Sequence, residues 1–214
     1  MIVVREVPMS FTYCFLAARC ELAELQAGML AAWPTLEVTE PAQEFASWDE
    51  AFQWAGPRCG YIAGAHPNDV KLLFRDGTWS VVSDISTCMS SDTESLQELS
   101  RRVGRVVVAS TQGTVGFAEL QVFEAGGAIR SITGHGGRTT ESGAALPEEA
   151  DVAIETFYLR ELDTIWRRMG LSSFLAAEPA GPVVALHVLD RVPLTESAPA
   201  PSQRRAQRPW WRLW

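Results

Sequence analysis

The three histidines are the first residues to consider for chemistry, because imidazole changes its charge near neutral pH. His135 lies in the stretch TGHGGR, where its imidazole, Arg138 and glycine backbone N–H groups could bind an anion or an anionic substrate. The stretch lacks the GxxxxGKS/T spacing of a phosphate-binding loop, so a hairpin or interstrand loop is the simpler interpretation. His187 lies among apolar neighbours, which is typical of a buried histidine with a hydrogen-bond partner, and His66 lies in a turn.

The four cysteines have neither the spacing of a metal site nor that of a catalytic nucleophile. Cys14, Cys20, Cys59 and Cys88 form no CxxC pair and have no neighbouring histidine, so we predict buried, reduced thiols. The chain also lacks a GxSxG elbow, a dinucleotide fingerprint and the kinase motifs. We therefore expect no catalytic residues, no metal ion and no cofactor. An enzyme that uses the histidine–arginine loop described above remains an alternative.

The spacing of apolar residues predicts a mixture of helices and strands. The expected helices cover residues 21–33, 47–56, 91–104 and 147–170. The expected strands are residues 2–7 and 10–19, a hairpin at 69–86, a strand at 105–110, a hairpin at 114–133 and a strand at 182–192. Ser91 and Glu94 suit a capping box at the start of the third helix, and residues 134–147 are expected to form a loop.

Strands cluster between the helices instead of alternating with them, which favours an α+β fold. We predict a largely antiparallel, mixed sheet packed by about four helices, with an extended C-terminal tail. Residues 1–192 are expected to form one globular domain, with a separate N-terminal lobe over residues 1–60 as the alternative. Residues 193–214 are expected to be a proline-rich linker followed by a basic, tryptophan-rich tail.

The charge of the chain is divided unevenly between these two parts. Residues 1–192 carry 14 basic and 25 acidic side chains, a net charge of −11, whereas residues 193–214 carry four Arg and one Glu, a net charge of +3. An acidic body argues against nucleic-acid binding and suits a basic protein partner. The N-terminus does not resemble a signal peptide, and no apolar run is long enough to span a membrane, so a cytoplasmic location is expected.

The central stretch from Trp79 to Glu149 has an order of elements that is familiar. A Trp-bearing strand ending at Asp84 is followed by a capped helix, the strand VVVAS, a long strand ending in FEAGGAIR, and ESGAALPEE. This pattern resembles small uncharacterised proteins of bacterial toxin–immunity loci. The resemblance transfers no functional residue, because its motifs are structural. It implies a cytoplasmic, stoichiometric inhibitor that binds and occludes a cognate toxin.

Aromatic residues beside charged ones are the candidates for binding such a protein partner. Trp48, Asp49 and Glu50 form one group, although Trp48 would instead be a core residue if its short helix packs inward. The tail contributes the second group, Trp210, Trp211 and Trp214. Two interpretations of the tail remain open: it folds back on the acidic body or on a second copy, or it binds a partner or, weakly, a membrane surface. A tail-tethered structural or regulatory domain is the alternative function.

Overall fold

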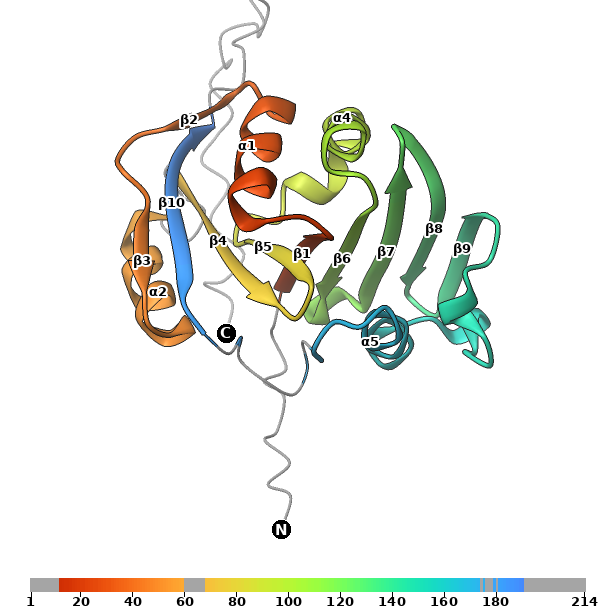
Figure 1. Cartoon of the computed structure of the whole chain (residues 1–214). Helices are drawn as coiled ribbons and strands as arrows, with labels where there is room; N and C mark the ends of the chain where they lie inside the picture. Colours follow the sequence, from red (N-terminus) through yellow and green to blue (C-terminus); the bar gives the residue numbers. More distant parts are fainter. Residues whose placement is uncertain (1–11, 60–67, 174, 176–178, 180, 191–214) are drawn as a thin grey trace, which may run out of the picture.

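The structure, a computed structural model, describes residues 12–59, 68–173, 175, 179 and 181–190. Its strands form one sheet in the order β2-β10-β4-β5-β1-β6-β7-β8-β9, and β3 also pairs with β10. Every pair of neighbouring strands is antiparallel. The predicted α+β fold is therefore confirmed, and the sheet is antiparallel throughout the described residues (Figure 1).

The strands are β1 (Thr12–Ala18), β2 (Leu36–Val38), β3 (Gln43–Phe45), β4 (Asn68–Asp76), β5 (Trp79–Asp84), β6 (Val106–Gln112), β7 (Phe117–Glu124), β8 (Gly127–His135), β9 (Arg138–Gly143) and β10 (Val183–Asp190). The α-helices are α1 (Leu22–Ala32), α2 (Trp48–Ala55), α4 (Thr93–Val103) and α5 (Leu159–Arg168). Short 3-10 helices are η1 (Gly56–Arg58), η2 (Met89–Ser91), η3 (Gly113–Val115), η4 (Pro147–Glu149) and η5 (Ile154–Thr156).

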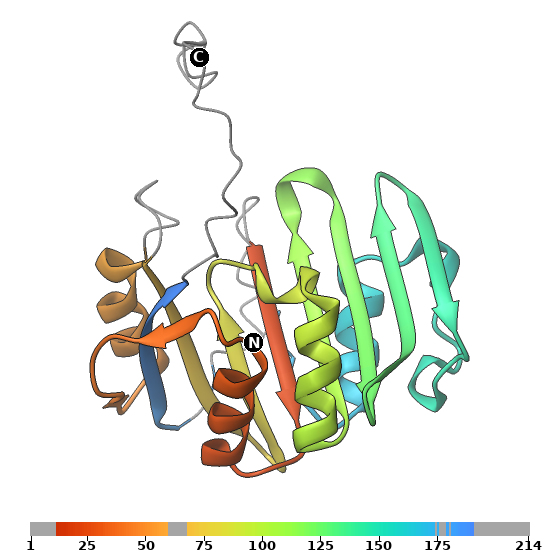
Figure 2. The ribbon, with the colours of Figure 1, turned by 90° about the horizontal axis from the view of Figure 1, so that it is seen from above.

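Helices cover both faces of the sheet, so the molecule has three layers (Figure 2). On one face α1 and α4 bury apolar residues of the central strands, among them Leu16, Val82 and Val108. The two helices approach closely at Gly28, because an added Cβ there would lie 2.9 Å from Val103. On the other face α2 and α5 cover a core that includes Phe74 and many other aromatic side chains.

A buried charged network lies on the α1/α4 side of the sheet, where β4 and β5 pair. The Lys71 ammonium group donates to Asp84 Oδ1 and, at 2.5 Å, to Asp69 Oδ2. The Ser86 hydroxyl lies 2.6 Å from the Asp69 carboxylate and 2.8 Å from that of Asp84. Burial alone would lower the pKa of Lys71, but the two carboxylates outweigh burial and raise the pKa above its usual value. Lys71 therefore stays charged inside the protein.

A second buried ion pair lies on the α2/α5 side. Arg130 of β8 binds Glu149 of η4 through two hydrogen bonds, from Nε at 2.8 Å and from Nη2 at 2.7 Å. The same guanidinium contacts Glu141 of β9 at 2.5 Å. This pair joins the segment that follows β9 to the sheet.

The expected helix over residues 147–170 is wrong in its first half. Only residues 159–168 form the α-helix, and η4 and η5 replace the rest. Asp151 has a φ of 59°, a left-handed conformation that interrupts a helix. The buried contacts of Glu149 with Arg130, and of Phe157 with the core, outweigh the helical spacing of this segment.

Two further expectations differ from the structure. Residues 134–147 were expected to be a loop, but His135 pairs with Arg138 across a tight turn, and β9 extends to Gly143. At the start of α4 the side chain of Asp92, not Ser91, accepts the capping hydrogen bond, from the backbone N–H of Ser95 at 3.1 Å. The expected strand at residues 2–7 lies outside the described residues.

Candidate protein-binding surface

Helix α2 starts where the sequence predicts it, with Ser47 as its N-cap. The Ser47 hydroxyl accepts from the Glu50 backbone N–H at 3.3 Å, and the Glu50 carboxylate accepts from the backbone N–H of Ala46, the residue before the cap, at 3.2 Å. Ala51 and Ala55 are buried against the sheet. The remaining side chains of this short helix therefore lie at or near the protein surface.

Trp48 and Phe52, one helical turn apart, form a stacked aromatic pair at this surface. Their ring centroids are 6.3 Å apart and their planes differ by 22°. Trp48 is half-buried and contacts Phe74 of the core edge to face, with centroids 5.6 Å apart. Phe52 is 47% exposed, unlike most large apolar side chains of the protein. Trp48 is thus anchored in the core, as one interpretation expected, and it supports an exposed ring; its role in binding a partner stays a prediction.

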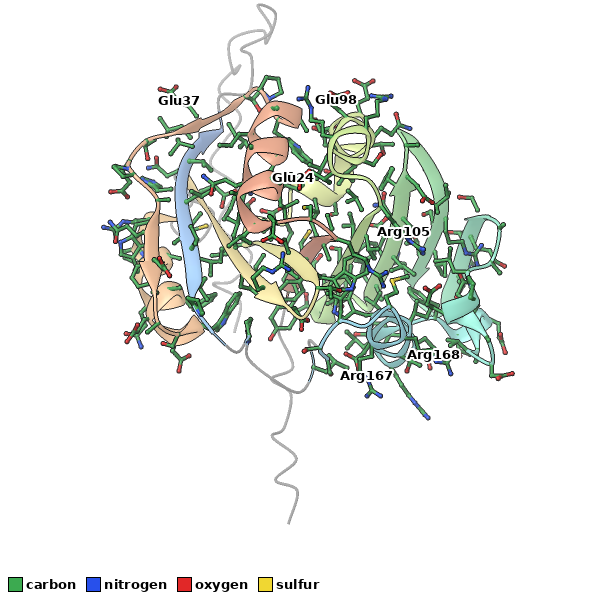
Figure 3. The ribbon with its side chains drawn as sticks, in the orientation of Figure 1. Glu24, Glu37, Glu98, Arg105, Arg167 and Arg168 are labelled. Atoms are coloured by element: carbon green, nitrogen blue, oxygen red, sulfur yellow. The ribbon has the colours of Figure 1, made fainter. Side chains whose placement is uncertain are left out.

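The segment that contains this aromatic pair is rich in carboxylates. Residues 36–58 contain five acidic side chains and a single basic one, Arg58. Glu44, Asp49 and Glu50 are exposed, and Glu37 projects outward from β2 in Figure 3. The arginines of α5, Arg167 and Arg168, lie elsewhere, on the far side of the sheet from α1 and α4 (Figure 3). We call Trp48, Phe52 and the exposed acids Glu44, Asp49 and Glu50 the α2 surface.

Next to the α2 surface, ionic and aromatic contacts join α2 to the edge of the sheet. The guanidinium of Arg58 lies 4.2 Å from the ring centre of Trp54 and 3.4 Å from the Glu40 carboxylate. Glu40 Oε1 also lies 3.2 Å from Nδ1 of His187 on β10. His187 was expected to be a core histidine, but its side chain is 18% exposed and reaches the polar edge of the sheet.

The other candidate residues are not part of the α2 surface. Trp210, Trp211 and Trp214 lie outside the described residues. His135 lines a pocket of about 310 Å³ between the β8–β9 turn and the start of α5, whereas Arg138 does not line it. The anion site expected from His135 and Arg138 is therefore not formed by this pocket.

The remaining chemistry-bearing residues do not assemble into a metal or redox centre in the described ranges. No group of three or more His, Cys, Asp or Glu side chains there could hold a metal ion. The thiols are reduced, and Cys14 and Cys59 are buried, whereas Cys88 is exposed, contrary to the expectation for it. No helix among these residues is long and apolar enough to cross a membrane.

Comparison with known proteins adds no relative. No family model, no curated protein and no solved structure matches this chain.

Phe52, the most exposed ring of the α2 surface, is not among the residues predicted from the sequence to bind a partner. A sequence signal for it exists: Phe52 is four residues after Trp48, so the two rings must lie on one side of the helix. The structure distinguishes the two rings: Trp48 contacts Phe74 of the core, whereas Phe52 is 47% exposed.

Proposed function

We propose that this protein binds another protein through the α2 surface, and that it is an immunity-type stoichiometric inhibitor that occludes a cognate bacterial toxin. One observation carries the proposal: Phe52 is 47% exposed, is stacked on Trp48, and lies in a segment that contains the exposed acids Glu44, Asp49 and Glu50. Aromatic rings at the centre of an interface typically supply most of its binding energy.

The charges of the α2 surface favour a basic partner. Glu44, Asp49 and Glu50 are exposed in a segment whose sole cation, Arg58, already contacts Glu40. Carboxylates at the rim of an interface accelerate association with a positively charged protein and repel acidic competitors. A toxin that acts on nucleic acid has a basic substrate cleft, which an acidic inhibitor with a protruding ring could fill.

The function is tested by co-expression with the product of the neighbouring gene. We expect that product to stop growth when expressed alone, and the wild-type chain to restore growth and form a 1:1 complex. The immunity function is rejected if the neighbouring product is harmless, or if it kills equally with and without this chain.

The binding site is tested separately by Phe52→Ala and Asp49→Arg. Truncation of a central ring is expected to weaken the complex by about 30-fold or more. Val115→Ser is the matched control, because Val115 is 48% exposed and lies on η3, outside the α2 surface. A complex that Phe52→Ala leaves as tight as Val115→Ser does would place the interface elsewhere.

A further inference from the structure

A pocket independent of the α2 surface lies where three segments meet. Its lining residues come from Gly116, which lies between η3 and β7, from the β8–β9 turn and from the residues before α5. Its volume of about 310 Å³ is at the lower end of the range for small-molecule sites. Phe157, which is almost fully buried, and the adjoining half-buried Tyr158 form one wall of the pocket.

The walls of this pocket are fixed by contacts on both sides. Gly134 of β8 lies against the backbone of Phe157, so closely that an added Cβ would meet its carbonyl oxygen at 1.9 Å. The Thr139 hydroxyl donates to the Glu155 carbonyl oxygen at 3.2 Å and so links β9 to η5. The His135 ring contacts Phe117 edge to face, with centroids 6.4 Å apart. The cavity is therefore preformed.

Two polar groups border this pocket: the imidazole of His135, which is exposed, and the hydroxyl of the half-buried Tyr158. The two threonine hydroxyls already donate to backbone carbonyl oxygens. An apolar wall with a few polar groups that can exchange water for a ligand is the usual form of a site for a small ligand. No Lys or Arg lines the pocket, which disfavours an anionic ligand.

We propose that this pocket binds a small, neutral aromatic molecule with one hydrogen-bonding group, of the phenol or indole class. Its ring lies against Phe157 and Tyr158, and its hydroxyl or N–H bonds to His135 or to the Tyr158 hydroxyl. The cavity is large enough for one or two fused rings. Such binding is separate from the proposed protein–protein function and does not depend on it.

The proposal is tested by titrating the ¹⁵N-labelled full-length chain with phenol, indole, toluene and benzoate. We expect phenol and indole to shift the amide signals of residues 134–139 and 156–158, with dissociation constants on the order of 1 mM for ligands of this size. Toluene lacks the hydrogen bond and benzoate carries a charge, so both are expected to bind more weakly. Shifts scattered over the surface, or equal for all four compounds, would overturn the proposal.

Two variants locate the ligand. Gly116→Asn adds a side chain beside the cavity at a position with a φ of +63°, which asparagine tolerates, and it should abolish phenol binding. Gly77→Asn is the matched control, with a φ of +58° and open space in the β4–β5 turn. Tyr158→Phe should weaken phenol about threefold to tenfold and leave toluene unchanged. Unaltered phenol binding in Gly116→Asn would exclude this pocket.

Discussion

The two faces of the sheet are covered by helices in different ways. On one face α1 and α4 are regular helices, packed against each other at Gly28 and over aliphatic side chains. On the other face the 3-10 helices η1, η4 and η5 accompany α2 and α5, and the core there contains Trp79, Trp166 and Phe157. Local sequence patterns specify both helices of the first face, whereas the irregular segment before α5 on the second face depends on a contact with a distant strand. The exposed features with functional potential, the α2 surface and the His135 pocket, both belong to the second face or its margin.

Each face also buries a charge, and the two charges are satisfied differently. Lys71 is held by Asp69 and Asp84, which lie on its own strand and on the neighbouring one. Arg130 is held by Glu149, which arrives from a segment beyond the next strand. The lysine therefore belongs to the sheet itself, whereas the arginine organises a segment outside it. Removal of the Lys71 charge should therefore affect the protein differently from removal of the Arg130 charge, and this difference can be tested.

The largest effect is expected for Lys71→Met. This substitution leaves two carboxylates buried without a counter-charge, and loss of one partner of a buried ion pair typically lowers the free energy of unfolding by about 3–5 kcal/mol. Urea denaturation followed by circular dichroism measures the change. The double variant Lys71→Met/Asp84→Asn should recover part of the loss. If the free energy of unfolding falls by less than about 1 kcal/mol, water must reach the carboxylates that contact Lys71, and the network is not buried as described.

Arg130→Met is expected to lower the free energy of unfolding less, by about 2–4 kcal/mol, because Glu149 can regain water when its segment loosens. Hydrogen exchange should accelerate over residues 147–157 while α1 and α4 stay protected. Glu141→Gln is the matched control, since the Glu141 side chain is 54% exposed and should contribute less than about 1 kcal/mol. Equal acceleration on both faces would contradict the assigned role of Arg130.

Gly28→Leu is expected to lower the free energy of unfolding by about 1–3 kcal/mol, because the larger side chain must force α1 away from α4. Thermal unfolding measures this loss. Gly56→Leu serves as the control, since a Cβ at Gly56 meets nothing within 4 Å. If both variants melt alike, the close approach of the two helices is not required for stability.

The smallest expected effect concerns the reactivity of the thiols. Their rates of alkylation by iodoacetamide at pH 8 measure how accessible the α1/α4 face is to a reagent. Burial and the charge of Glu24 raise the pKa of Cys20 to about 11, so little thiolate forms at this pH. Exposed Cys88 should react first, and buried Cys14 last. The Cys20 rate should rise about tenfold per pH unit until the pH reaches its pKa. Peptide mass spectrometry resolves the sites, and equal rates for Cys20 and Cys88 would contradict this order.

The sequence predicted the elements that are specified by neighbouring residues. The hairpin at residues 69–86 and the helices expected at 47–56 and 91–104 follow from short-range patterns, although Asp92 and not Ser91 caps the second of these helices. The segment 147–158 could not be predicted in this way, because its conformation depends on Arg130, far away in the chain. The same holds for the candidate sites: Trp48, Asp49 and Glu50 could be found locally, whereas the pocket needed three segments brought together.

The burial of Lys71 has a practical consequence for the chemistry of the whole molecule. It is the single lysine of the chain, and it is 1% exposed. The folded protein therefore presents no accessible lysine amine to acetyl donors, ubiquitin-conjugating enzymes or amine-directed cross-linkers. Any reaction at Lys71 requires that the sheet opens around this residue. The rate at which an amine-reactive reagent labels Lys71 would therefore measure how often the sheet opens.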